Sequence, residues 1–145
     1  MRVVLQRVKE ARVVIEGQIF NEIKKGLLVL ACIEREDTEE ALSWMAEKIA
    51  SIRIFPDEAG KFNRNIKDVG GEVLVISNFT LCGELKKGTR PSFHLAEEPI
   101  LAQGKLNRFI QMLREKGLVV KEGQFGAYMD VELINDGPVT IILQR

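Results

Sequence analysis

The stretch GLLVLACI, residues 26–33, decides the fold of this chain. After Gly26 it contains no polar side chain, so it lacks the alternation that a half-exposed strand shows. A strand that is covered on both faces is apolar throughout. The stretch therefore predicts a central strand of a sheet that needs cover on both faces.

Further strands are expected on both sides of this stretch. Short apolar or alternating runs between turn residues predict them. They cover residues 3–8, 11–17, 18–23, 52–55, 72–77, 118–123, 128–134 and 138–144. The glycine-containing segment 56–71 predicts a loop or an irregular hairpin.

Two stretches have helical periodicity. Asp37 or Thr38 can cap the first, and Pro99 begins the second, which ends near Lys116 with Gly117 as its C-cap. Apolar residues recur at helical spacing in both. They are Ala41, Leu42, Met45, Ile49 and Ile52 in the first, and Leu101, Leu106, Phe109, Ile110 and Leu113 in the second.

Strands outnumber helices, so two helices leave part of the sheet uncovered. We therefore predict an α/β fold with layered mixed β-sheets and the two main helices on one side. One domain should span residues 1–145, a length typical of a single domain. A homodimer is a natural way to bury the remaining surface.

Composition excludes several classes of protein. The chain has 46% hydrophobic residues, 29% charged residues and a formal net charge of +0, which argues against disorder and against charge-driven binding to nucleic acid or membrane. A nucleic-acid partner would need a local basic patch or a limited contact. No run approaches the roughly 18 apolar residues of a membrane span. Because Arg2 and Arg7 interrupt the N-terminus, it does not resemble a signal peptide, and we expect a cytoplasmic protein with no membrane contact.

The residues that usually carry catalysis are scarce. His94 is the one histidine, so a Ser-His-carboxylate set would have to recruit it, and we expect a surface or loop role instead. Cys32 and Cys82 have no metal-like spacing, and two cysteines with one histidine do not supply three or four ligands. We expect no metal and no cofactor. The cysteines are expected to be small core hydrophobes in a reducing cytoplasm.

Two short segments follow strongly apolar strands and contain hydroxyl, amide and glycine groups. They are SNFTLCG, residues 77–83, and NDGPVT, residues 135–140. Strand ends that lead into loops commonly hold binding groups on a rigid scaffold. Gly137 and Pro138 fit either an ordinary turn or a pair of backbone groups presented to a ligand. The basic segment KKGTR, residues 86–90, fits either a phosphate contact or a solvated loop.

These segments resemble the two motifs of the D-aminoacyl-tRNA deacylases, Ser-Gln-x-Thr-Leu and Asn-x-Gly-Pro-Val-Thr. Here they are Ser77-Asn78-Phe79-Thr80-Leu81 and Asn135-Asp136-Gly137-Pro138-Val139-Thr140. The similarity extends over the whole chain. It includes MRVVLQRV at the start, GLLVLACIEREDTEE (26–40), KIASIRIFPDEAGKFN (48–63), DVGGEVLVISNFTL (68–81), KGTRPSF (87–93) and FGAYMDVELINDGPVT (125–140). Asn78 is a departure, because the family motif has glutamine there.

The resemblance implies an enzyme of translation quality control. A homodimer of this family hydrolyses the ester between a D-amino acid, or glycine, and the terminal adenosine of tRNA. It also implies a cis peptide between Gly137 and Pro138 that reaches into the pocket of the partner subunit. Two backbone carbonyl groups would then hold the α-amino group of the substrate and exclude the side chain of an L-amino acid.

The resemblance also implies roles for single residues. The N–H groups of Phe79 and Thr80 are candidates for stabilising the oxyanion. The Thr80 hydroxyl can position the substrate, act as the nucleophile or have a structural role, and the 2′-hydroxyl of the adenosine helps to activate water. Ser77 and Asn78 are expected to bind the adenosine, on whose base Phe79 can stack.

Three further residues have alternative roles. Arg7 either supports the Gly137–Pro138 segment or is an exposed edge-strand arginine. Phe125 and Met129 either line the pocket or belong to the core. Two rival functions also remain, a dimeric module that binds tRNA or nucleotide without catalysis and a threonine-dependent esterase of small free esters.

Overall fold

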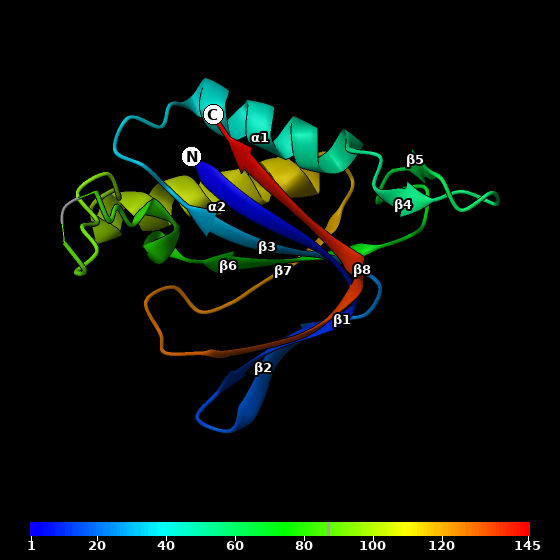
Figure 1. Cartoon of the computed structure of the whole chain (residues 1–145), viewed down its shortest axis with the longest axis horizontal. Helices are drawn as coiled ribbons and strands as arrows, with labels where there is room; N and C mark the ends of the chain where they lie inside the picture. The colour runs from blue at the N-terminus through cyan, green and yellow to red at the C-terminus, as the bar shows by residue number, and fades with distance from the viewer. Residues whose placement is uncertain (87) are drawn as a thin grey trace.

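A mixed six-stranded sheet forms the centre of the computed structural model, which describes residues 1–86 and 88–145 (Figure 1). The strand order is β2-β1-β3-β6-β7, and β8 pairs with β1. The strands are β1 (Arg2–Ile15), β2 (Gln18–Ile23), β3 (Gly26–Cys32), β6 (Glu72–Ser77), β7 (Val119–Glu122) and β8 (Asp130–Gln144). The pairs β3–β6 and β6–β7 are parallel, and β1 is antiparallel to its neighbours β2, β3 and β8. The predicted α/β class is confirmed.

Strand β3 is covered on both faces, as the apolar stretch predicts. Leu27, Val29 and Ala31 belong to the larger core cluster, whereas Leu28 belongs to a second cluster with residues of β1, β2 and β6. All four are buried. Alternate residues of one strand therefore contribute to two separate cores.

The two predicted helices are present, and both pack into the larger core cluster. Helix α1 (Glu39–Ser51) has Thr38 as its N-cap, whose side chain accepts a hydrogen bond from the Ala41 N–H at 3.3 Å. Helix α2 (Pro99–Glu115) begins at the predicted proline, and Gly117 follows it with φ +81°. Both helices lie above the same face of the sheet (Figure 1).

Two predicted strand breaks are absent. Residues 3–8 and 11–17 form most of the single strand β1, and residues 128–134 and 138–144 form most of the single strand β8. The register explains the turn-like residues in β8, because Gln6 pairs with Thr140 while Val8 pairs with Asn135. Arg7 alone therefore faces residues 136–139. The Asn-Asp-Gly-Pro sequence forms a bulge within one strand and does not separate two strands.

The remaining strands are short. The predicted strand 52–55 is wrong for its first three residues, which have no regular structure; only Phe55 is in a strand, β4 (Phe55–Pro56). It pairs with β5 (Phe62–Arg64) to form the irregular hairpin expected within 56–71. No helix in the described part of the chain is long and apolar enough to cross a membrane.

Candidate active site

The turn that follows β6 is anchored to the end of β3. Ala31 pairs with Ser77 across the parallel strands, and the Asn78 N–H donates to the Ala31 carbonyl at 2.8 Å. The 3₁₀ turn η1 (Phe79–Cys82) then begins. Phe79 and Thr80 are its first residues, and the first N–H groups of a helix have no partner inside it. Within residues 1–86 and 88–145, neither N–H donates a hydrogen bond.

The Thr80 hydroxyl is held by a neighbouring amide. Its Oγ1 donates to Oδ1 of Asn78, and the Thr80 side chain is exposed. An amide oxygen accepts a hydrogen bond but does not remove the proton at neutral pH. The contact therefore orients the hydroxyl without activating it as a nucleophile.

A cavity of about 500 Å³ lies beside this turn. Five residues of the predicted site line it, namely Ser77, Asn78, Phe79, Phe125 and Met129. Phe125 and Met129 are half-buried, and they also pack against the core clusters. Phe93 lines the cavity as well, although it was not among the predicted site residues.

Phe79 presents an open aromatic ring at the edge of this cavity. Its side chain is 56% exposed, and the ring of Phe93 meets it edge-on at 5.1 Å between centroids, with an interplanar angle of 76°. An edge-to-face contact of this kind fixes an aromatic ring while its other surface remains free. Phe79 is therefore available to stack on a planar ligand.

The bulge of β8 carries Gly137 and Pro138, whose peptide bond is cis, as the resemblance implies. Both residues are exposed. Asn135 closes the bulge, because its Oδ1 accepts from the Val139 N–H at 2.8 Å and its Nδ2 donates to the Val139 carbonyl at 3.1 Å. Asn135 belongs to the recognised motif, but its role in shaping the bulge was not predicted.

Arg7 supports the same bulge from β1. Its Nε donates to the Asp136 carbonyl at 2.8 Å and its Nη1 to the Ile54 carbonyl at 2.6 Å. The guanidinium also lies 5.3 Å from the centre of the Phe62 ring. The residue is only 7% exposed, so the alternative of an exposed edge-strand arginine is wrong.

The cavity and the bulge are separate within one chain. The cavity lining does not include Gly137, Pro138 or Arg7. Thr80 lies in the turn beside the cavity but is not part of its wall. Figure 1 shows the end of β6 and the bend of β8 at opposite ends of the sheet. The two motifs therefore do not meet within one chain.

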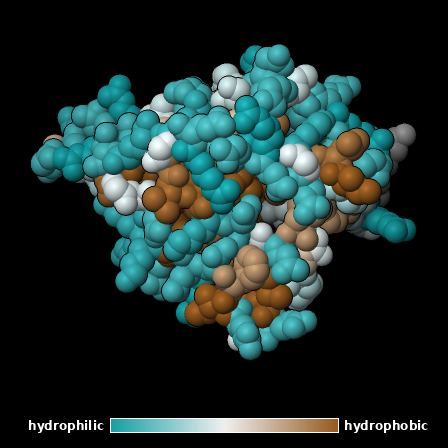
Figure 2. Space-filling view, turned by 180° about the vertical axis from the view of Figure 1, so that it is seen from behind, coloured by the Kyte–Doolittle hydropathy of each residue, from teal (hydrophilic) through white to brown (hydrophobic). Residues whose placement is uncertain are grey.

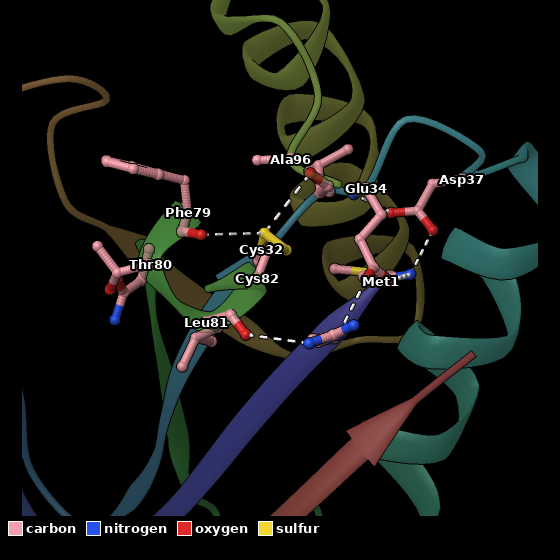
Figure 3. Close-up of a disulfide and its surroundings, with 12 residues drawn as sticks. Met1, Cys32, Glu34, Asp37, Phe79, Thr80, Leu81, Cys82 and Ala96 are labelled. Carbon is pink, nitrogen blue, oxygen red and sulfur yellow. Dashed lines mark hydrogen bonds and ion pairs between the residues drawn. A yellow bond between two sulfur atoms is a disulfide. The ribbon is translucent and has the colours of Figure 1, made fainter. Parts of the chain in front are cut away.

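Cys32 and Cys82 form a disulfide with 6.4 Å between their Cα atoms (Figure 3). Both are buried, as expected, but the prediction that they are unpaired core residues is wrong. The parallel pairing of β3 and β6 places the ends of these strands side by side, and η1 then returns Cys82 to Cys32. Sequence spacing alone does not reveal this contact, because 50 residues separate the two cysteines.

Comparison with known proteins identifies the family. The model of the family "D-Tyr-tRNA(Tyr) deacylase" matches residues 4–144. The chain belongs to this family. A D-aminoacyl-tRNA deacylase of Thermotoga petrophila is 51% identical over 143 residues, which cover 99% of this chain and 96% of the relative. A D-aminoacyl-tRNA deacylase of Magnetococcus marinus is 55% identical over 144 residues, which cover 99% and 95%.

Two solved structures are similar to this deacylase-family chain. One, described as "c-Myc DNA Unwinding Element Binding Protein", has a TM-score of 0.94 and 42% identity, covering 100% of this chain and 99% of that chain. The other, described as a probable eukaryotic D-amino acid tRNA deacylase, has a TM-score of 0.85 at 16% identity, covering 98% and 97%. At that identity the second likeness shows the fold alone.

His94, Glu84 and Glu97 of this family member each have a polar partner. His94 is exposed and does not line the 500 Å³ cavity; its Nδ1 lies 3.1 Å from the Ser92 hydroxyl. Glu97 does line it, and a hydrogen bond from Lys105 lowers the pKa of its carboxyl group below the ordinary value. Lys86 lowers the pKa of Glu84 in the same way. The basic segment 86–90, which fits either a phosphate contact or a solvated loop, includes Lys87, and Lys87 lies outside the described residues.

Among the described residues, no group of three or more His, Cys, Asp or Glu side chains is arranged to hold a metal ion. The cavity instead offers an aromatic ring, amide and hydroxyl groups, and two N–H groups at the start of the adjoining turn. These groups suit a nucleoside carrying a polar carbonyl group.

Proposed function

We propose that this chain hydrolyses the ester bond between a D-amino acid, or glycine, and the terminal adenosine of tRNA. The products are the free amino acid and tRNA, and L-aminoacyl-tRNA is spared. One observation carries the proposal: Ser77, Asn78 and Phe79 of the first family motif line a cavity next to two N–H groups that have no partner among the described residues. The activity named for relatives about half identical in sequence supports the same substrate class.

The cavity is suited to the terminal adenosine. Ser77 and Asn78 offer polar groups to the nucleoside, and the exposed ring of Phe79 can stack on adenine. Stacking of a base on an aromatic side chain typically contributes ~1–3 kcal/mol. Phe125 and Met129 add apolar side chains to the lining of the same cavity. The contacts bind the adenosine that every tRNA shares, so they do not depend on the identity of the tRNA.

The chemistry follows from the turn. Water attacks the ester carbonyl carbon, and the N–H groups of Phe79 and Thr80 stabilise the oxyanion that forms. The bond to the ribose oxygen then breaks. The 2′-hydroxyl of the adenosine assists the attacking water. The substrate thus takes the part that a side-chain base has in other hydrolases. Thr80 positions the reacting ester, since its hydroxyl is bound to an amide and not to a base.

Chirality is read by the second motif, supplied by the partner subunit of a homodimer. Gly137 and Pro138 are exposed on a bulge that Arg7 and Asn135 fix from behind. Their carbonyl oxygens accept from the α-amino group and leave no room for an L side chain. Because backbone atoms make this contact, the preference extends over D-amino acids of different side chains.

Exposed apolar residues support dimerisation. Ile19 and Phe20 lie on β2, Ile134 lies on β8, and all three are exposed. Figure 2 shows apolar patches, one of them at the lower end of the molecule, where Figure 1 places the β1–β2 hairpin. Patches of this kind commonly mark interfaces. We propose a single cytoplasmic domain, residues 1–145, that is active as a homodimer and uses no cofactor.

The test is deacylation of D-aminoacyl-tRNA by the purified protein. We expect turnover that is unchanged in EDTA and strongly reduced when the terminal adenosine lacks its 2′-hydroxyl. Binding without turnover would favour the non-catalytic module. Equal rates with and without the 2′-hydroxyl, together with hydrolysis of small free esters, would favour the threonine-dependent esterase.

A further inference from the structure

We propose that the Cys32–Cys82 disulfide positions the catalytic turn, and that a dithiol reductant lowers the rate of deacylation by opening it. The inference rests on the proposed function for its kinetic readout. It assigns to two buried residues a role in the reaction that neither family motif describes.

Two links join the catalytic turn to the end of β3. The Asn78 N–H donates to the Ala31 carbonyl at 2.8 Å before the turn, and the disulfide joins Cys82 to Cys32 at its far end. Phe79 and Thr80, whose N–H groups we assign to the oxyanion, lie between these links (Figure 3). The disulfide therefore holds the end of a four-residue turn whose other end is already fixed.

The two sides of the disulfide differ in how firmly they are held. The chain after Cys32 is fixed by buried charges, because the Met1 ammonium group pairs with Glu34 at 2.9 Å and also with Asp37. On the other side, Phe79 and Thr80 are exposed, and among the described residues the Leu81 carbonyl accepts one long hydrogen bond, of 3.4 Å from Arg2. The next link along the chain is the pairing of Glu84 with Ser92, which lies beyond the turn. When the bridge opens, the turn therefore gains more freedom than the end of β3.

The redox step balances with a dithiol. A thiolate of the reductant attacks one sulfur, the Cys32–Cys82 bond breaks, and the second thiol of the reductant resolves the mixed disulfide. The protein gains two electrons and two protons as two thiols, and the reductant becomes a disulfide. Disulfides of cytosolic proteins are commonly of this reversible, redox-sensing kind outside hyperthermophiles.

Loss of the link should affect the rate more than the binding of substrate. Oxyanion donors act because they are fixed before the reaction, and a displacement of about 1 Å can cost a rate factor on the order of 100. Ser77, Phe125 and Met129 lie outside the turn and continue to bind the adenosine. We therefore expect kcat to fall by about 10- to 100-fold, while KM rises by a smaller factor because Phe79, which can stack on the adenine, lies within the turn.

The experiment compares oxidised protein with protein treated with dithiothreitol. Mass spectrometry after alkylation counts the thiols, circular dichroism checks the fold, and kcat and KM are measured with D-aminoacyl-tRNA. The Cys32→Ser/Cys82→Ser protein is the matched control. It should show the reduced kcat in both conditions, and reoxidation of the wild-type protein should restore its rate.

Hydrogen exchange gives a readout independent of activity. Reduction should speed exchange in peptides covering 79–83 and leave those of α2 unchanged. If the oxidised protein does not deacylate its substrate, the proposed function fails, but this exchange result still tests the positioning. Equal kcat and equal exchange before and after reduction of a folded protein would overturn the inference. Global unfolding on reduction would also overturn it, because the disulfide would then stabilise the whole fold.

Discussion

At the scale of single residues, the proposed role of Thr80 rests on its contact with Asn78. The Thr80 hydroxyl donates to the side-chain carbonyl of Asn78, so its proton is directed to an amide and not to a base. A hydroxyl in this arrangement is suited to orient a substrate. Asn78, which replaces the glutamine of the family motif, is thus part of the same small unit.

Thr80→Ala is expected to keep substantial activity. The change removes one hydrogen bond and its positioning effect, and we expect kcat/KM to fall by no more than about 30-fold. Single-turnover deacylation of D-aminoacyl-tRNA measures it. A covalent aminoacyl-Thr80 intermediate, trapped and detected by mass spectrometry, would show that the hydroxyl is a nucleophile.

Asn78→Gln is expected to be tolerated, with kcat/KM changed by only a few-fold. The substitution keeps the amide and adds one methylene, for which an ordered water can compensate. Asn78→Ala, which removes the amide that Thr80 contacts, should be the more damaging variant. If glutamine instead reduces kcat/KM as strongly as alanine does, the pocket is built around the shorter side chain.

At the scale of secondary-structure elements, the bulge in β8 carries the two residues to which we assign the selectivity. Asn135 closes it and Arg7 holds it from the neighbouring strand, so the exposed Gly137 and Pro138 rest on a buried support. The tight geometry at Gly137 makes this support testable. A Cβ atom added there would lie 2.5 Å from the Val139 backbone nitrogen and 2.7 Å from its Cγ2.

Gly137→Ala is therefore expected to shift the bulge and misplace its carbonyl oxygens. Activity on D-aminoacyl-tRNA should fall by about 100-fold, while the exposed position lets the fold survive. Gly104→Ala is the matched control, because it lies in α2 with nothing within 4 Å of the added Cβ. It should raise the free energy of unfolding by about 0.5–1 kcal/mol at unchanged kcat/KM. Equal activity of the two variants would show that the bulge is not part of the active site.

At the scale of the whole molecule, sequence patterns predicted the elements better than their connections. The apolar stretch 26–33 correctly indicated a strand buried on both faces, and helical spacing located both helices. The bulge was missed because it depends on how many residues of β8 oppose Arg7, which is a property of register. The disulfide was missed because it depends on the parallel pairing of β3 with β6.

The separation of the cavity from the bulge predicts complementation between subunits. Asn78→Trp should fill the cavity, and Gly137→Ala should displace the bulge, so each homodimer should be inactive. A mixed dimer keeps one intact cavity facing one intact bulge. Random mixing of the two variants should therefore recover about a quarter of the wild-type activity, since half of the dimers are mixed and each has one of two sites. No recovery from a verified mixed dimer would place both motifs of a site in the same chain.

We propose that backbone groups read the chirality of the amino acid, and deacylation of matched charged tRNAs tests this role. The purified protein is given the same tRNA charged with the D-amino acid, its L enantiomer or glycine, at one enzyme concentration. We expect rapid release of the D-amino acid and of glycine, and no release of the L-amino acid above the rate of spontaneous hydrolysis. Equal rates for the two enantiomers, or no release of the D-amino acid, would contradict the account.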